Sequence, residues 1–418
     1  MSNQFTLMRE KRFQPFFFVQ FLGAFNDNVF KTAFITLVVF HSTSLTDINP
    51  IALATILPGV FILPFFLFSA TSGQLADKYE KSFLMRLVKQ FEIGIMTLAA
   101  LGFVFHIFWL LVLALFLMGM HSTLFGPVKY AYLPQHLNER ELLGGNGMVE
   151  MGTFLAILLG QIGGAWLVMQ NGGEVLAASA VILLAVLGYA FSRQVPPSPA
   201  ADAGLKINWN PVTETYRNIA LIRERPKIWS AVLGISWFWF FGATLLAQFP
   251  QFAKVVLRGD ENLFILMLAL FSVGVGVGSL FCERLSKGLV EIGLVPIGGL
   301  GLTLFGADLY LSSPHVSIRL FMDIALIGFF GGIFIVPLYT LVQSIAEKTH
   351  QSRVTAANNI LNALFMVMSA GFSMLVFSFG MNIPQLFLMT ALLNLLVVCG
   401  LCWHQPEYWR RMLQWLKF

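Results

Sequence analysis

The sequence predicts an all-α membrane protein with twelve transmembrane helices, arranged as two pseudo-repeats of six. Three observations support this prediction. First, 57% of the 418 residues are hydrophobic and only 11% are charged, whereas soluble domains carry about 25% charged residues. Second, apolar stretches long enough to cross about 30 Å of hydrocarbon recur along the whole chain. Third, blocks of sequence in the first half have counterparts in the second.

The predicted spans follow one another with short connections and one long interruption. We expect the first span to stay in the protein, because it is too long for a signal peptide and lacks a small-residue cleavage site. The twelve spans cover residues 15–40, 51–75, 84–105, 107–128, 146–169, 175–192, 229–252, 263–282, 290–311, 317–340, 354–379 and 384–403.

The interruption is a polar, proline-containing linker at residues 193–228. It separates a first bundle (1–192) from a second bundle (229–418). Asn210 and Pro211 have the pattern of an N-cap and a first helical residue. The sequence then places arginines beside an apolar face, which favours a short helix on the inner leaflet; a solvated linker is the alternative. The apolar face would hold Val212, Tyr216 and Ile219.

The distribution of Lys and Arg predicts the orientation. With a cytoplasmic N-terminus, only three of the 26 basic residues fall in outer loops, and Lys31 lies within a span. The positive-inside rule therefore predicts that both termini are cytoplasmic. The net charge of +5 reflects this topology and does not indicate nucleic-acid binding. The three outer basic residues are Lys254, Arg258 and Arg319.

Two pairs of similar blocks relate the halves. LMGMHSTLFGPVKY (117–130) parallels LIGFFGGIFIVPLY (326–339), and GGNGMVE (144–150) parallels AANNILN (356–362). Parallel repeats of this kind place a substrate site near the bilayer midplane, between the halves. Within single spans, glycines four residues apart predict close helix packing. These are Gly160 with Gly164 and Gly274 with Gly278.

Polar side chains interrupt the first span, where hydrocarbon tolerates few of them. The stretch FLGAFNDNVFK (21–31) contains Asn26, Asp27, Asn28 and Lys31. Each charge costs about 2.5–3.5 kcal/mol at the bilayer centre, so such residues face protein or a wet cavity. Asp27 and Lys31 are four residues apart and can pair on one helix face. Either the pair is a structural unit buried between helices, or the four side chains form a polar floor for a substrate headgroup.

Other polar residues can reach the same floor. Lys129 follows Pro127 at the inner end of the fourth span, where it could meet a phosphate or act as a snorkelling anchor. Asn146 and Glu150 enter the fifth span from the same side. The sequence also places Glu92 near the inner edge of the third span, beside Lys89.

The loop between the second and third spans carries a recognisable pattern. GQLADKYEK (73–81) resembles the Gly-x-Leu-Ala-Asp-Lys/Arg signature of the major facilitator superfamily, with Glu80 in place of the usual glycine. The resemblance implies the major facilitator fold and a role in conformational gating. Asp77 would cap a neighbouring helix end in one conformation, and lysines would hold the inner face. The gating residues are Gly73, Asp77, Lys78 and Lys81.

Longer blocks resemble one family within that superfamily. FLGAFNDNVFK, LFGPVKYAYLPQHL and ELLGGNGMVEMGTFLAILLGQIGG are similar to the lysophospholipid transporter family, and most to the transporter portion of its fusions with an acyltransferase. Asp27 and Lys129 match the family's polar positions. The resemblance implies a flippase that moves lysophospholipids such as lysophosphatidylethanolamine to the inner leaflet of a bacterial inner membrane for reacylation. Since this chain stops at Phe418, we expect any acyltransferase partner to act in trans.

Two other functions stay open beside the lysophospholipid transporter. One is a proton-coupled transporter of another amphiphile, drug or siderophore, in which Asp27 or Glu150 would titrate. The other is a membrane anchor or regulatory subunit of an acyltransferase. We expect no enzyme and no cofactor, since no nucleophile–base set is visible and Cys399, Cys402 and His404 make half of a metal site at most.

Overall fold

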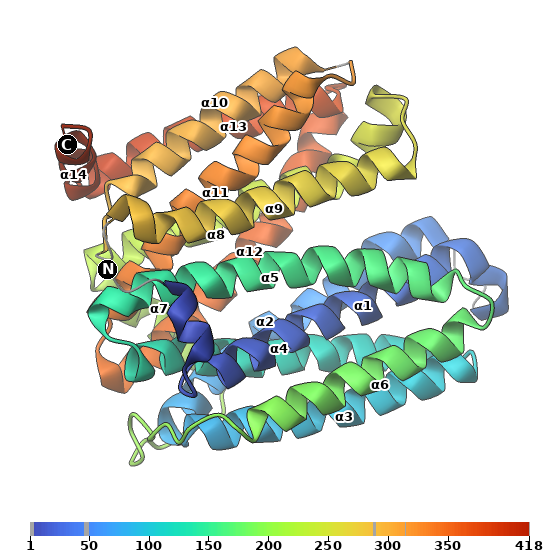
Figure 1. Ribbon diagram of the computed structural model, residues 1–418, viewed down its shortest axis with the longest axis horizontal. Helices are drawn as coiled ribbons and strands as arrows, with labels where there is room; N and C mark the ends of the chain where they lie inside the picture. Colours follow the sequence, from blue (N-terminus) through green and yellow to red (C-terminus); the bar gives the residue numbers. More distant parts are fainter. Residues whose placement is uncertain (1–3, 46–49, 287–289, 314, 418) are drawn as a thin grey trace.

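The computed structural model describes residues 4–45, 50–286, 290–313 and 315–417. Within these residues the regular structure is entirely helical, as expected (Figure 1). The first bundle begins with a short 3-10 helix and contains six long helices. They are η1 (Gln4–Arg9), α1 (Gln14–Leu45), α2 (Pro50–Lys78), α3 (Lys81–Val104), α4 (Phe108–His136), α5 (Glu139–Val168) and α6 (Gly173–Ser192).

The linker and the second bundle add eight α-helices and two short helices. The linker contains α7 (Pro211–Arg223), and the chain ends with the short α14 (Glu407–Trp415). The others are α8 (Pro226–Gln251), η2 (Phe252–Val256), α9 (Glu261–Ser286), α10 (Leu294–Ser312), α11 (Ile318–Ile345), η3 (Lys348–His350), α12 (Gln351–Ser378) and α13 (Ile383–His404).

Each of the twelve predicted spans falls in one of the twelve long helices. In the described part of the chain, eleven helices are long and apolar enough to cross a membrane. The remaining long helix is α1, whose 32 residues include the polar stretch at 26–31. The chain is therefore a multi-pass membrane protein.

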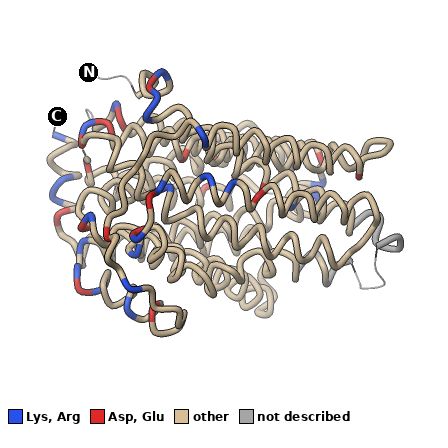
Figure 2. Tube along the Cα trace, turned by 90° about the horizontal axis from the view of Figure 1, so that it is seen from below, with Lys and Arg blue, Asp and Glu red and all other residues tan. Residues whose placement is uncertain are grey.

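Charged residues gather at one end of the two bundles. Figure 2 shows most Lys, Arg, Asp and Glu residues at the end where both termini lie, with a smaller set along the middle of the helices. We call the first location the charged end and the other the opposite end. This segregation keeps most charges out of the apolar middle, where their cost is highest.

Glycines bring helices into close contact, as their spacing predicts. A Cβ at Gly160 of α5 would lie 2.7 Å from Cβ of Asn28 on α1. A Cβ at Gly274 of α9 would lie 3.0 Å from the backbone nitrogen of Phe329 on α11. Any larger side chain at these positions would push the helices apart, so α1 packs on α5 and α9 on α11 with backbones nearly touching.

The predicted helix in the linker is confirmed. The Asn210 side chain accepts hydrogen bonds from the first turn of α7, and Pro211 is the first helical residue. The face that packs on the protein holds Glu214, Asn218 and Ile222, which are buried. Val212 and Tyr216 are exposed, and Ile219 is half-buried. The apolar face is thus free to contact a leaflet, which stays a prediction.

The two bundles meet at the charged end. Asn146 of α5 exchanges side-chain hydrogen bonds of 2.9 Å with Gln343 of α11. From η1, the Gln4 side chain donates to the Leu280 carbonyl of α9 at 2.9 Å. These bonds, together with those of Asp77 described below, close the charged end, while the ribbons of the two bundles diverge toward the opposite end (Figure 1).

Candidate functional site

The four polar side chains of α1 do not form one floor. Successive helical residues point about 100° apart, so the four reach different neighbours. The Asn26 amide is fully buried and donates to Glu92 Oε1 of α3 at 2.7 Å. The Asn28 amide donates to the Ala24 carbonyl of its own helix at 2.8 Å. Both asparagines therefore serve the interior of the first bundle.

Asp27 and Lys31 are partly exposed, and each has its own neighbour. The Asp27 carboxylate accepts a 2.6 Å hydrogen bond from the Ser122 hydroxyl of α4, and its second oxygen has no hydrogen-bond partner. The Lys31 ammonium lies 4.7 Å from the centre of the Phe61 ring. The two charges are not within ion-pair distance in this conformation, so the pairing that the sequence suggested does not form.

Behind Asn26 lies a buried charged network, of which the sequence predicted only that Glu92 lies beside Lys89. Lys89 Nζ lies 2.6 Å from Glu92 Oε2, and His121 Nε2 of α4 lies 3.2 Å from the same oxygen. The exposed fractions of the three side chains are between 0 and 2%. Glu92 is the twelfth residue of α3, so its expected place at the inner edge is wrong. The i,i+3 spacing of Lys89 and Glu92 was the available signal, but only the fold brings His121 and Asn26 to them.

A second acid and base lie nearer the charged end. Glu150 of α5 is 1% exposed, and its Oε1 accepts a 2.7 Å hydrogen bond from the Tyr130 hydroxyl. Its Oε2 has no hydrogen-bond partner among the described residues. Lys129 Nζ lies 4.6 Å from the centre of the Tyr130 ring. The Tyr130 ring stacks on Tyr339 of α11 at 4.7 Å, which joins this pair to the second bundle.

Asn146 lies in the contact between the two bundles, whereas the sequence groups it with the polar residues around Asp27. It is fully buried and bonded to Gln343 and Thr340 of α11. In this conformation the residue therefore holds the bundles together at the charged end.

Charge is distributed unequally between the bundles. In the described helices of the second bundle the charged residues lie near helix ends, whereas Asp27, Lys31, Glu92, Lys129 and Glu150 lie well inside helices of the first. The facing helix α8 is strongly aromatic and packs through Phe238 and Trp239 on Phe154 of α5. The first bundle thus contributes the charged side chains, whereas the second contributes aromatic rings and uncharged polar groups such as Ser236 and Asn362, which are hydrogen-bonded at 2.9 Å.

The segment at 73–81, for which the resemblance implies a gating role, lies at the contact of α2 with α12. The Asp77 carboxylate accepts hydrogen bonds of 3.0 Å from the Ser352 backbone N–H and from Nε of Arg353. It therefore caps the first turn of α12, where the N-terminal N–H groups need an acceptor. A Cβ at Gly73 would lie 2.7 Å from Cβ of Ala356. The predicted capping by Asp77 of a neighbouring helix is confirmed for this conformation.

Of the two lysines in this segment, Lys81 is hydrogen-bonded to the linker and Lys78 contacts an aromatic ring. Lys81 is fully buried and donates from its backbone to Ser198 at 3.0 Å and from its side chain to the Pro199 carbonyl at 3.3 Å. Lys78 lies 5.9 Å from the centre of the Tyr79 ring.

The contacts of the Glu80 side chain give a reason for the presence of Glu at this position, where the superfamily signature has glycine. Its carboxylate accepts from the backbone N–H groups of Ser82 and Phe83, at 2.8 and 2.7 Å, and from that of Ser198 at 2.7 Å. It thus caps α3 and binds the linker at once. Burial alone would raise the pKa of Glu80, but the hydrogen bonds outweigh it and hold the pKa below its ordinary value.

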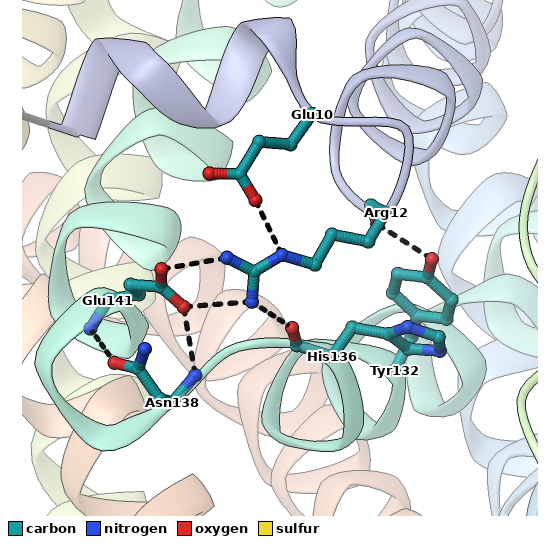
Figure 3. Close-up of polar contacts among 6 residues, drawn as sticks. All are labelled: Glu10, Arg12, Tyr132, His136, Asn138 and Glu141. Atoms are coloured by element: carbon teal, nitrogen blue, oxygen red, sulfur yellow. Dashed lines mark hydrogen bonds and ion pairs between the residues drawn. The ribbon is translucent and has the colours of Figure 1, made fainter.

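A further polar cluster at the charged end is structural (Figure 3). The Arg12 guanidinium, just before α1, donates to both Glu141 oxygens at 2.7 and 2.9 Å and to the His136 carbonyl at 2.6 Å. The Tyr132 hydroxyl donates to the Arg12 carbonyl at 2.7 Å. The cluster fixes the start of α1 to the turn between α4 and α5, which sets the depth of Asp27.

An apolar groove of about 590 Å³ lies elsewhere on the first bundle, between α2, α3 and α4. It is lined by residues such as Leu75, Leu87 and Leu124 and contains none of the candidate site residues. The charged side chains described above are therefore separate from it.

Comparisons with known proteins agree with this architecture. The family model of the Major Facilitator Superfamily matches residues 16–370. The human organic anion transporter MFSD10 has a similar structure, with a TM-score of 0.76 and 14% identity, covering 93% of this chain and 99% of that one. The Escherichia coli fucose:proton symporter FucP has a TM-score of 0.71 and 11% identity, covering 95% and 100%.

Two curated relatives carry one name. The lysophospholipid transporter LplT of Enterobacter sp. (strain 638) is 27% identical over 389 residues, covering 91% of this chain and 93% of that protein. The LplT of Escherichia coli O157:H7 (strain EC4115 / EHEC) is 30% identical over 335 residues, covering 79% of each. The chain matches the family model, has twelve long helices and resembles these two relatives over most of its length. It therefore belongs to the major facilitator superfamily and, within it, to the family of the lysophospholipid transporter LplT.

Proposed function

We propose that this protein transports lysophospholipids, such as lysophosphatidylethanolamine, to the inner leaflet of a bacterial inner membrane, where they are reacylated. One observation carries the proposal most directly. Among the described residues, the first bundle holds two carboxylates and two ammonium groups that are not ion-paired, and the second bundle faces it with the aromatic rings of Phe238 and Trp239. A lysophospholipid has a charged headgroup and one acyl chain, so its two parts match these two sets of side chains.

The charged groups suit a zwitterionic or anionic headgroup. Within the described part of the chain, Asp27 has one carboxylate oxygen without a partner for an ammonium or hydroxyl group. The described contacts of Lys31 and Lys129 are with aromatic rings, so both ammonium groups are available for phosphate. Ser122, which holds Asp27, and Lys129 are seven residues apart on α4. They share a face about 10 Å apart along the axis, a separation that a headgroup and two side chains can bridge.

The expected orientation of the protein in the membrane and its conformation are both consistent with inward movement of a lysophospholipid. By the positive-inside rule the charged end would be cytoplasmic, which puts both termini on that side. Because the bundles are joined at this end, the conformation would receive substrate from the outer side. A cytoplasmic acyltransferase acting in trans would consume the product and draw net flux inward.

The experiment is a flipping assay in proteoliposomes with lysophosphatidylethanolamine, with and without an imposed pH gradient. We expect Asp27→Asn and Lys31→Ala to lose flipping, and wild type to be indifferent to the gradient. Lys254→Ala is the matched control, since Lys254 is an exposed lysine near the opposite end. An active Asp27→Asn protein would contradict the headgroup site.

The alternative is a proton-coupled transporter of another amphiphile, drug or siderophore. The observation that favours it is Glu150, a buried carboxylate with one oxygen unpartnered, because burial of an unpaired carboxylate favours the protonated form. Wild-type transport that collapses when the pH gradient is removed, together with a gradient-independent Glu150→Gln protein, would establish this alternative.

A further inference from the structure

The C-terminal helix α14 is bound to the second bundle by one of its faces. Tyr408 and Met412 are 1% and 4% exposed, and Trp415 Nε1 donates to the Leu285 carbonyl of α9 at 2.8 Å. These three residues follow an i, i+4, i+7 spacing and therefore share one side of the helix. The position of α14 is thus fixed by packing.

A second apolar face of α14 lies next to the first and has no partner in the described chain. Trp409, Leu413 and Leu416 are 48%, 42% and 61% exposed. They also follow an i, i+4, i+7 spacing, about 100° round the helix from the packed face. We call these three residues the outer apolar face.

The remaining arc of the helix continues in a definite order. Arg410 comes directly after the outer apolar face, and Gln414 and Glu407 follow it, by the same 100° rotation per residue. Glu407 pairs with Lys227 at 2.7 Å, and Arg411, next to the packed face, pairs with Glu291 at 2.8 Å. Lys417 lies just after the last helical residue, Trp415, and it is exposed, as are Arg410, Gln414 and Glu407. The order from apolar through basic to polar is that of a helix lying at a membrane surface, where basic side chains reach anionic headgroups and the polar side meets water.

The place of α14 in the fold agrees with this order. It packs on α10 and α13, two helices apolar enough to span a membrane, at the outer corner of the second bundle. It runs across the direction of those helices at the charged end (Figure 1). Beside it, Trp403 near the end of α13 is 90% exposed. A helix placed across the ends of lipid-facing spans lies at the headgroup level.

We propose that α14 is an interfacial membrane helix, which inserts its outer apolar face into the leaflet at the charged end and binds anionic phospholipid headgroups through Arg410 and Lys417. The occupant of this face is lipid and not a protein, because the face is continuous with the lipid-facing ends of α10 and α13 and is bordered by basic residues. This surface is independent of the transported substrate, and so is its test.

The first experiment measures depth with nitroxide labels on the full chain, after Cys399 and Cys402 are replaced by serine; Cys282 is buried. Leu413→Cys and Gln414→Cys are adjacent positions on different faces. In liposomes containing phosphatidylglycerol we expect the label at 413 to collide with oxygen several-fold more than with a water-soluble nickel complex. The label at 414 should show the reverse. Equal exposure of both labels to nickel would overturn the proposal and leave the face to a protein partner.

The second experiment tests the charge. Arg410→Gln with Lys417→Gln should move the label at 413 toward water, and the shift should resemble that of the unsubstituted helix when phosphatidylcholine replaces phosphatidylglycerol. Arg410→Lys with Lys417→Arg keeps both charges and should leave the depth unchanged. If the neutral double variant keeps its full depth in phosphatidylglycerol, anionic headgroups are not the ligand and that part of the proposal is wrong.

Discussion

Asp27 and Glu150 each keep one carboxylate oxygen without a hydrogen-bond partner. In hydrocarbon such a group is expensive unless it is protonated or faces a cation. Lys31 and Lys129 are charged groups whose described contacts are with aromatic rings. Because these carboxylates and ammonium groups are not paired with each other, they can bind the two opposite charges of a zwitterion. This is the physical reason for proposing that a headgroup binds there.

Glu92 illustrates the opposite case, a charge that is fully paired. Glu92→Gln should destabilise the protein by about 3–5 kcal/mol, because it leaves the Lys89 ammonium buried beside a neutral amide. Adding Lys89→Met should restore much of the loss, since the uncompensated charge is then gone. Thermal unfolding in detergent measures both. Equal stabilities of Glu92→Gln and wild type would show that Lys89 finds another acceptor.

At the scale of the element, the turn between α2 and α3 predicts a pH dependence. The pKa of Glu80 lies below its ordinary value of 4.5, so its hydrogen bonds stabilise the fold above that pH and are lost as the pH falls through the lower folded value. Hydrogen exchange at Ser198, compared at pH 7 and at pH 3, should show the linker released in acid.

Glu80→Gln is the matching variant. It keeps an acceptor oxygen but no charge, so exchange at Ser198 should be faster than in wild type at pH 7 and nearly independent of pH. Because one of the two capping oxygens stays, the loss of stability should be smaller than the roughly 0.5–2 kcal/mol that removal of a whole N-cap side chain costs. An unchanged pH response in Glu80→Gln would mean that another group titrates.

The contact of α2 with α12 depends on the absence of a side chain at Gly73. Gly73→Ala places a methyl group 2.7 Å from Cβ of Ala356 and 3.0 Å from the Ser352 carbonyl, so we expect the charged end to open more often. Alkylation of Thr340→Cys, at a fully buried position, should then accelerate. Gly94→Ala is the control, because a Cβ there meets nothing within 4 Å, and it should leave alkylation unchanged.

At the scale of the whole molecule, Asp77 links the bundles. Asp77→Asn keeps an acceptor for the Ser352 N–H but loses the ion pair with Arg353, so the charged end should open more often while substrate binding is retained. Distances between spin labels on the two bundles and equilibrium binding of lysophosphatidylethanolamine measure the two effects. Lost binding with an unchanged distance distribution would make Asp77 a site residue instead.

Much of the architecture follows from the sequence. Among the described residues, hydropathy locates eleven of the twelve long helices, because a helix in hydrocarbon must be apolar for about 20 residues whatever it packs against. The polar stretch at 26–31 lowers the hydropathy of the twelfth, α1. The N-cap at Asn210 and the close approach at Gly160 also depend on local chemistry or on residue size, which sequence displays directly. The capping by Asp77 is implied by the resemblance to the superfamily signature.

What the tertiary structure decided is which polar groups meet. Asn26 and Asp27 are neighbours in sequence, yet Asn26 joins Glu92 inside the first bundle while Asp27 turns to Ser122 of α4, because adjacent helical residues point about 100° apart. Asn146 proves to be a contact between the bundles, and His121 joins a network no spacing could reveal. Such partners lie tens of residues away, and their meeting depends on helix rotation and depth, which packing sets and hydropathy does not encode.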